Sequence, residues 1–122
     1  VLGPNCYEGS GIGISNTPEK CGAEVNHFFA EENCDIILSC GGGELMCEVV
    51  SHIDFERIAR AKAKWYMGFS DNTNLTFLLP TLCDTVVLTA WIHWWEQDLT
   101  VLPHLMSGIR RMASSGLWSP VT

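Results

Sequence analysis

Apolar residues alternate between helix-like and strand-like spacing along most of the chain. Stretches with apolar side chains three and four positions apart predict helices at 18–32, 45–50, 55–59 and 70–82. Short apolar runs predict strands at 35–40, 64–69 and 85–89. Helices that alternate with strands in this order favour right-handed crossovers between parallel strands. The pattern therefore predicts an α/β fold, a layered parallel sheet with flanking helices.

The last of these predicted helices has the most regular apolar stripe. Its leucines fall at positions i, i+3, i+4 and i+7, namely Leu75, Leu78, Leu79 and Leu82. This spacing predicts that all four are buried on one face. Pro80 lies in the same stretch, where it should cost about 3 kcal/mol or kink the helix.

The segments that flank the helix and strand pattern differ from it. Residues 3–18 are rich in Gly, Ser, Asn and Pro and predict a loop. The run at 35–40 is almost continuously apolar, as expected of a strand buried on both faces of a sheet. The sequence begins at Val1 rather than Met, which suggests a fragment or a processed product.

Beyond Ala90 the pattern degrades. Four tryptophans crowd into this part of the chain, at Trp91, Trp94, Trp95 and Trp118. A helix is expected only around 98–113. We therefore expect an α/β domain at 1–90 and a divergent or truncated tail at 91–122.

Composition narrows the class of protein. Hydrophobic residues make up 47% of the chain and charged residues 17%, which is typical of a globular domain. A net charge of −7 argues against nucleic acid as a partner, because such binding relies on Lys and Arg. No apolar run approaches the roughly 20 residues that span a bilayer. The start also lacks the pattern of a signal peptide, so we expect a cytoplasmic protein with no membrane association.

The six cysteines show no Cys-x-x-Cys pair and no regular spacing; they are Cys6, Cys21, Cys34, Cys40, Cys47 and Cys83. A structural zinc site usually takes its ligands from close pairs, so no metal site is expected. The cysteines are interpreted as small apolar thiols in a reducing compartment.

Two loops follow predicted strands and carry candidate chemistry, since sites in parallel sheets form beyond the carboxyl ends of strands. The first contains Gly41, Gly42 and Gly43, whose backbone N–H groups can approach a negative charge closely. It is either an oxyanion hole or a tight turn. The sequence leaves both open.

The second loop places Ser70 between a predicted strand and a predicted helix, with Gly68 two residues before it. This arrangement is typical of a nucleophile elbow, in which a sharp turn exposes the hydroxyl and the next N–H helps to hold an oxyanion. Asn72 replaces the second glycine of the familiar motif, which weakens the match. The alternative is that Ser70 only caps a helix. A further alternative is a non-catalytic module that binds an anion or a nucleotide at both loops.

A serine nucleophile needs a base, usually a histidine oriented by a carboxylate. None of the four histidines is distinguished by its position: His27, His52, His93 and His104. Residues 9–13 are glycine-rich, but they do not follow a predicted strand and lack the lysine of a phosphate-binding loop. The residues alone therefore identify no partner for Ser70.

Three motifs in order carry a resemblance to a known family. They are Ile-Leu-Ser-Cys-Gly-Gly-Gly at 37–43, Ile-Asp-Phe at 53–55 and Gly-Phe-Ser-Asp-Asn-Thr-Asn-Leu at 68–75. Over about residues 1–89 the chain resembles the LD-carboxypeptidase family, which includes the microcin C self-immunity peptidases. The form of the third motif is closer to the microcin-immunity branch than to the murein-recycling branch.

The resemblance implies a serine carboxypeptidase with Ser70 as nucleophile. The N–H of Asp71 and an N–H from Gly42 or Gly43 would hold the oxyanion, with no metal or organic cofactor. Substrates would be murein-type peptides with an L,D bond, or a microcin-type aminoacyl-nucleotide, and the protein would be a homodimer. The family's Glu and His lie in a second domain downstream of the matching segment. The resemblance does not extend to Glu96, His93 or His104, so this chain is expected to be inactive alone.

Overall fold

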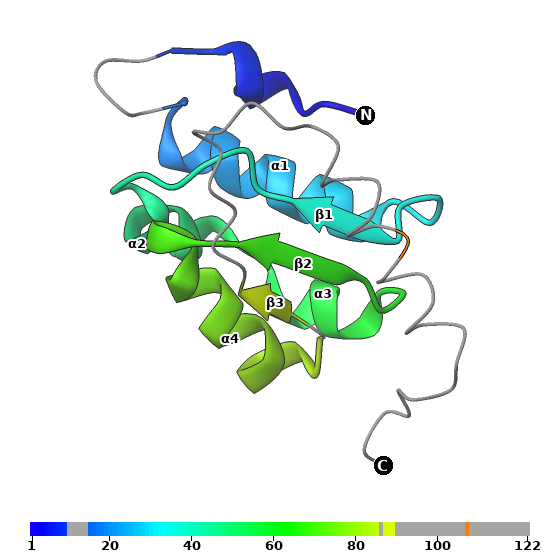
Figure 1. The fold of residues 1–122 in the computed structure, drawn as a ribbon. Helices are drawn as coiled ribbons and strands as arrows, with labels where there is room; N and C mark the ends of the chain where they lie inside the picture. Colours follow the sequence, from blue (N-terminus) through cyan, green and yellow to red (C-terminus); the bar gives the residue numbers. More distant parts are fainter. Residues whose placement is uncertain (10–14, 86, 90–106, 108–122) are drawn as a thin grey trace. The chain divides into compact units, whose positions relative to one another are not determined.

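Three parallel strands form the sheet in the part of the chain that the computed structural model describes, residues 1–9, 15–85, 87–89 and 107 (Figure 1). The strands are β1 (Ile36–Leu38), β2 (Trp65–Gly68) and β3 (Val87–Thr89). β2 lies in the middle, where Tyr66 is paired with Ile37 of β1 and with Val87 of β3. The predicted α/β fold with a parallel sheet is confirmed.

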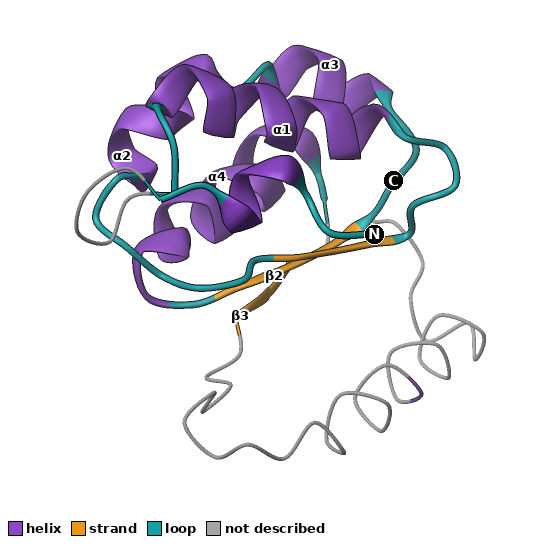
Figure 2. Ribbon diagram, turned by 90° about the horizontal axis from the view of Figure 1, so that it is seen from above, coloured by secondary structure: helices purple, strands orange, loops and turns teal. Residues whose placement is uncertain are grey.

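The helices connect these strands in the predicted order. They are α1 (Pro18–Ala30), α2 (Met46–Val49), α3 (Phe55–Arg60) and α4 (Thr73–Cys83), with the 3₁₀-helices η1 (Pro4–Tyr7), η2 (Val50–His52) and η3 (Ser70–Asn72). Figure 2 shows the four α-helices together on one side of the strands. One layer of helices therefore covers one face of the described sheet.

Local capping explains where two of these helices begin. The Thr17 side chain accepts a hydrogen bond from the N–H of Lys20, and Pro18 occupies the first turn of α1. The Asp54 carboxylate accepts from the N–H of Arg57 at 2.9 Å and starts α3. These signals lie within three residues of the helix that they start, which is why the sequence pattern locates both helices.

The core lies between the helices and β2. Its buried members are Phe29, Val49, Ile53, Ile58, Tyr66, Leu75, Leu79 and Cys83. Leu75 and Leu79 are fully buried, as the stripe on α4 predicts, but Leu78 is only half-buried and Leu82 is 52% exposed, so the prediction is wrong for these two. Leu82 lies in the last turn of α4 beside buried Cys83, and its side chain lines a surface pocket instead of the core. The helix continues through Pro80 to Cys83.

Two other expectations need correction. β1 is only half-buried along its length, because it pairs with β2 alone and forms an edge of the described sheet. The segment 3–18 is not wholly loop, since η1 occupies part of it.

Contacts within the chain divide it into two units, Val1–Ile92 and His93–Thr122, and the architecture above belongs to the first. The expected helix around 98–113 and the four tryptophans fall outside the described residues, Ser107 excepted. Among the described helices, none is both long and apolar enough to cross a bilayer.

Candidate active site

The two loops singled out in the sequence meet at the carboxyl end of the sheet. β1 and β2 are neighbours, and the N–H of Ser39 donates to the carbonyl of Met67 at 2.9 Å, so the strands stay together as the loops begin. A Cβ atom placed on Gly42 would lie 2.9 Å from the Cβ and 3.1 Å from the Oγ of Ser70, and 3.8 Å from the N of Asp71. The structure thus brings Gly42 against Ser70 and Asp71, and Gly43 follows in the same exposed loop.

Ser70 has the backbone geometry of a sharp elbow. Its φ of 56° lies in the left-handed region, which costs an L-residue about 1–2 kcal/mol. The side chain is exposed and makes no hydrogen bond to any residue that the structure describes. A helix cap has extended geometry and accepts an N–H, and neither is the case here. The geometry of Ser70 therefore fits an elbow rather than a cap.

Relief of this strain gives a first prediction. Ser70→Gly should raise the free energy of unfolding above that of Ser70→Ala by about 0.5–1 kcal/mol, because glycine adopts positive φ without a Cβ penalty. Asp84, at the end of α4, has a φ of 51° and provides a matched position away from the loops. Asp84→Gly should give a smaller gain, since Asp tolerates this region better than Ser. Urea unfolding of the variants measures both, and equal stability of the two Ser70 variants would contradict a strained elbow.

Gly68 is required by the tightness of the turn. A Cβ on Gly68 would lie 2.6 Å from the Cβ and 3.1 Å from the Cγ of Asn72, and 3.2 Å from the ring of Tyr66. The first of these distances is too short for a contact between side chains, so a residue with a Cβ here would force the backbone or Asn72 to move. Glycine at this position therefore lets the strand turn directly into η3.

Asn72 ties the elbow to the glycine loop. Its Nδ2 donates to the carbonyl of Gly41 at 2.6 Å and to that of Phe69 at 3.2 Å, and its Oδ1 accepts from the hydroxyl of Tyr66 at 2.7 Å. The residue is 3% exposed, and its φ of −62° does not call for glycine. Asn72 is therefore no defect in the elbow motif. The sequence showed that Asn72 replaces the second glycine of the motif. It did not show to which carbonyls the Asn72 amide would donate hydrogen bonds.

Tyr66 and Ser39 complete this polar network. Burial raises the pKa of Tyr66 above its ordinary value; the neighbouring Ser39 hydroxyl opposes the shift, and the negative charge of Asp71 adds to it. The phenol therefore stays protonated and available as a donor to Asn72. Ser39 Oγ also donates to the carbonyl of Gly41 at 2.8 Å. The Gly41 carbonyl thus accepts hydrogen bonds from Ser39, directly after β1, and from Asn72 in η3.

Asp71 has a second structural role. Its carboxylate accepts from the backbone N–H of Met46 at 2.7 Å, at the start of α2. The side chain of Asn74 donates to the Asp71 carbonyl at 3.0 Å. These bonds hold the residue that follows Ser70 against the helix that follows the glycine loop.

The described histidines lie with other partners. His27 pairs with Glu31 at 3.9 Å, and His52 pairs with Glu19 at 3.8 Å. His93 and His104 fall outside the described residues. The described part of the chain therefore shows a serine and its surroundings, with neither histidine hydrogen-bonded to Ser70. Nor does it bring together three or more His, Cys, Asp or Glu side chains as ligands for a metal ion.

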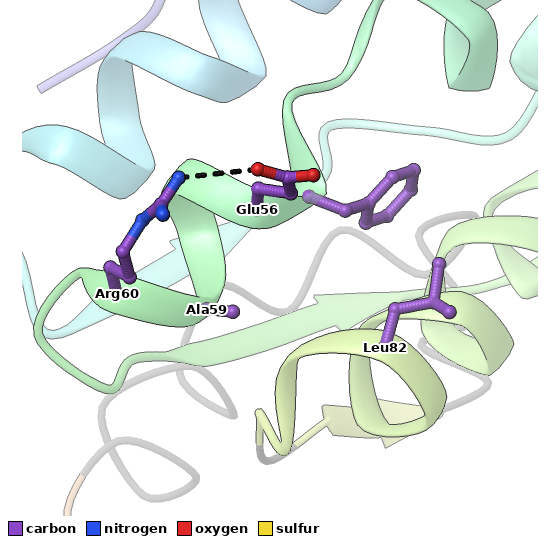
Figure 3. A pocket seen from close by; sticks show the side chains of 5 residues that line it. Glu56, Ala59, Arg60 and Leu82 are labelled. Carbon is purple, nitrogen blue, oxygen red and sulfur yellow. Dashed lines mark hydrogen bonds and ion pairs between the residues drawn. The ribbon is translucent and has the colours of Figure 1, made fainter.

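A surface pocket of about 510 Å³ lies elsewhere, between α3 and α4 (Figure 3). It is lined by Phe55, Glu56, Ala59, Arg60 and Leu82. Glu56 and Arg60, one turn apart on α3, form an ion pair at 3.4 Å, and both side chains are well exposed. Leu82 lies about 14 Å along α4 from Thr73, where the helix begins after Ser70, at 1.5 Å per residue. This pocket is therefore separate from the two loops.

The sequence match decides the family. Residues 1–90 match the LD-carboxypeptidase N-terminal domain. The chain belongs to the LD-carboxypeptidase family. This is a family of serine peptidases, and the matched residues include the two loops described above. No curated protein matches the chain.

Solved structures of a microcin C7 self immunity protein, MccF, share the fold. The wild-type protein without ligand matches with a TM-score of 0.65 and 21% identity, over 71% of this chain and 25% of MccF. A mutant of MccF in complex with adenosine monophosphate matches with the same TM-score and identity. The chain thus spans about a quarter of the length of these LD-carboxypeptidase relatives.

Proposed function

We propose that this chain is the nucleophile-bearing segment of a serine carboxypeptidase, with Ser70 as the nucleophile. The observation that carries the proposal is the elbow itself: an exposed serine at φ 56°, with Gly42 packed against its Cβ and Oγ. The hydroxyl is free of hydrogen bonds within the described residues and accessible to a substrate. Family membership favours this reading over a non-catalytic anion-binding module.

In the proposed reaction, Ser70 Oγ attacks the carbonyl carbon of an amide bond, and negative charge develops on the carbonyl oxygen. The N–H of Asp71 and an N–H of Gly42 or Gly43 would hold that oxygen, because both loops lie beside Oγ. The hydroxyl proton would pass to a histidine and then to the leaving amine. Water would release the acyl group.

The base would come from the family's downstream domain, in the chain order Ser, Glu, His. We therefore expect the 122-residue chain to hydrolyse no L,D-tetrapeptide. The coding sequence next to this segment, read in all frames, should supply the Glu and His.

The substrate class proposed is a peptide that ends in an unusual linkage. It is either a murein-type peptide with an L,D bond or a microcin-type aminoacyl-nucleotide. The MccF relatives support the second, since one is described as a self-immunity protein in complex with adenosine monophosphate. We propose that the complete protein is a cytoplasmic homodimer that binds neither nucleic acid nor membrane.

A fluorophosphonate probe tests the nucleophile. In the protein that continues through the downstream domain, the probe should label one serine, and Ser70→Ala should abolish the labelling. Ser51→Ala is a matched control, because Ser51 is also exposed but donates to the carbonyl of Glu48 at 2.7 Å. It should leave labelling unchanged. Absence of labelling in the unaltered longer protein, or labelling that survives Ser70→Ala, would overturn the proposal.

A further inference from the structure

Two thiols lie against each other beside the glycine loop. Cys6 Sγ and Cys40 Sγ are 3.3 Å apart, although the residues are 34 positions apart in the chain. Both residues are exposed, and all six cysteines are free thiols. Cys34 and Cys83 instead donate to backbone carbonyls, at 3.3 Å in each case. Cys6 and Cys40 are the two described cysteines whose sulfurs are in contact.

The chain on each side of this contact is held in place. On one side, the Asn5 amide donates to Glu24 Oε2 at 2.7 Å and to the carbonyl of Lys20 at 3.1 Å, which fastens η1 to α1. On the other, Ser39 and Gly41 flank Cys40 and take part in the hydrogen bonds that fix the glycine loop. The two sulfurs therefore meet because their neighbours are anchored.

We propose that Cys6 and Cys40 are a redox-modification site, where a low-molecular-weight disulfide such as oxidised glutathione converts the two thiols into an intramolecular disulfide. The sulfur atoms need to approach from 3.3 Å to about 2.05 Å for the bond to form. The bond fastens the N-terminal segment to the loop that packs against Ser70.

The reaction balances without any group from elsewhere in the chain. One protein thiolate attacks a sulfur of oxidised glutathione, forms a mixed disulfide and releases one glutathione thiolate. The second protein thiolate then attacks the protein sulfur of the mixed disulfide and releases the second glutathione thiolate. The two protons lost by the cysteines end on the two glutathione molecules, so two protein thiols are oxidised and one glutathione disulfide is reduced.

The protonation of Cys40 bears on the rate of these steps. Burial raises the pKa of Cys40 to about 11, and the contact with Cys6 and the charge of Glu24 add to the shift. Near neutral pH, Cys40 is therefore a thiol, and any attack by its sulfur requires loss of that proton. The reaction should accelerate as the pH rises toward the pKa of Cys40.

The test is a glutathione titration of the 122-residue chain, followed by digestion without reductant and mass spectrometry. We expect a peptide linked through Cys6 and Cys40 as the dominant disulfide, and a loss of mass equal to two hydrogen atoms. The melting temperature should rise on oxidation by an amount on the order of 10 °C, because a long loop is closed in the unfolded state. Dithiothreitol should reverse the rise.

Matched variants separate this site from general oxidation. Cys6→Ser should abolish both the linked peptide and the rise in melting temperature, whereas Cys47→Ser, at another exposed thiol, should preserve them. Ser70→Ala should change neither, so the result is independent of the proposed peptidase activity. The proposal is overturned if the Cys6–Cys40 peptide is no more abundant in buffer than in guanidinium chloride. It is also overturned if mixed disulfides between glutathione and these cysteines accumulate and the Cys6–Cys40 disulfide does not form.

Discussion

Gly42→Ala is expected to slow phosphonate labelling of Ser70 by about 100-fold, the loss typical of a damaged oxyanion hole. The added methyl group would lie 2.9 Å from the Cβ of Ser70 and 3.1 Å from its Oγ. The loop cannot simply move away, because the carbonyl of Gly41 is held by hydrogen bonds from Ser39 and Asn72. The new methyl group would therefore displace the nucleophile or its N–H donors. The rate is measured in the protein that continues through the downstream domain.

The neighbouring glycine provides the control. A Cβ on Gly41 meets no atom within 4 Å, and Gly41→Ala keeps the carbonyl that both hydrogen bonds require. Labelling should then stay within a few-fold of the unaltered protein. In the 122-residue chain, Gly42→Ala should lower the free energy of unfolding by about 1–3 kcal/mol through overpacking, and Gly41→Ala by under about 0.5 kcal/mol. Equal effects of the two substitutions on the labelling rate would contradict the idea that the contact between Gly42 and Ser70 is needed for labelling.

The parts of the fold that the sequence predicts are those with local signals. α1 and α3 each begin at a side chain that accepts a hydrogen bond from the N–H three residues later. The apolar spacing of α4 lies within its eleven consecutive residues. The exposure of Leu82 was missed because the leucine spacing does not mark the centre of the buried face of α4, which is formed by Leu75, Thr76, Leu79 and Cys83. The edge position of β1 was missed for a similar reason, since an apolar run does not reveal how many strands flank it.

The candidate site was predictable only as far as its two loops. Ser70, Asp71 and the glycine loop follow from motifs, and the structure places Gly42 directly against Ser70. The bonds that connect the loops join distant positions: Asn72 with Gly41 across 31 residues, and Asp71 with Met46 across 25. Spacing along a chain does not encode such pairs, because they depend on β1 and β2 being neighbours. The contact between Cys6 and Cys40 also joins distant positions, 34 residues apart, and it depends on the attachment of η1 to α1.

Asn72→Asp should destabilise the chain by about 3 kcal/mol at neutral pH, although the two side chains have almost the same shape. The amide donates to the carbonyls of Gly41 and Phe69, and a carboxylate in its place would hold an oxygen against both. The site is 3% exposed, so a charge there is desolvated, and removing a buried donor adds the cost of the unpaired acceptors. The hydroxyl of Tyr66 would still donate to the new group and offset part of this cost.

The pH dependence distinguishes this cause from a simple loss of packing. Burial and two facing carbonyls favour the neutral acid, so the folded chain raises the pKa of the new carboxyl group above its unfolded value near 4. The charge penalty is therefore fully present above the raised pKa and is relieved as the pH falls through it toward the unfolded value. Urea unfolding across this pH range should show the deficit of Asn72→Asp shrinking in acid. The same substitution at exposed Asn33 is the control and should change stability by under about 0.5 kcal/mol at every pH. A deficit that stays constant with pH would show that the charge at this position costs little. No deficit at any pH would show that the donors of Asn72 do not hold the glycine loop to the elbow.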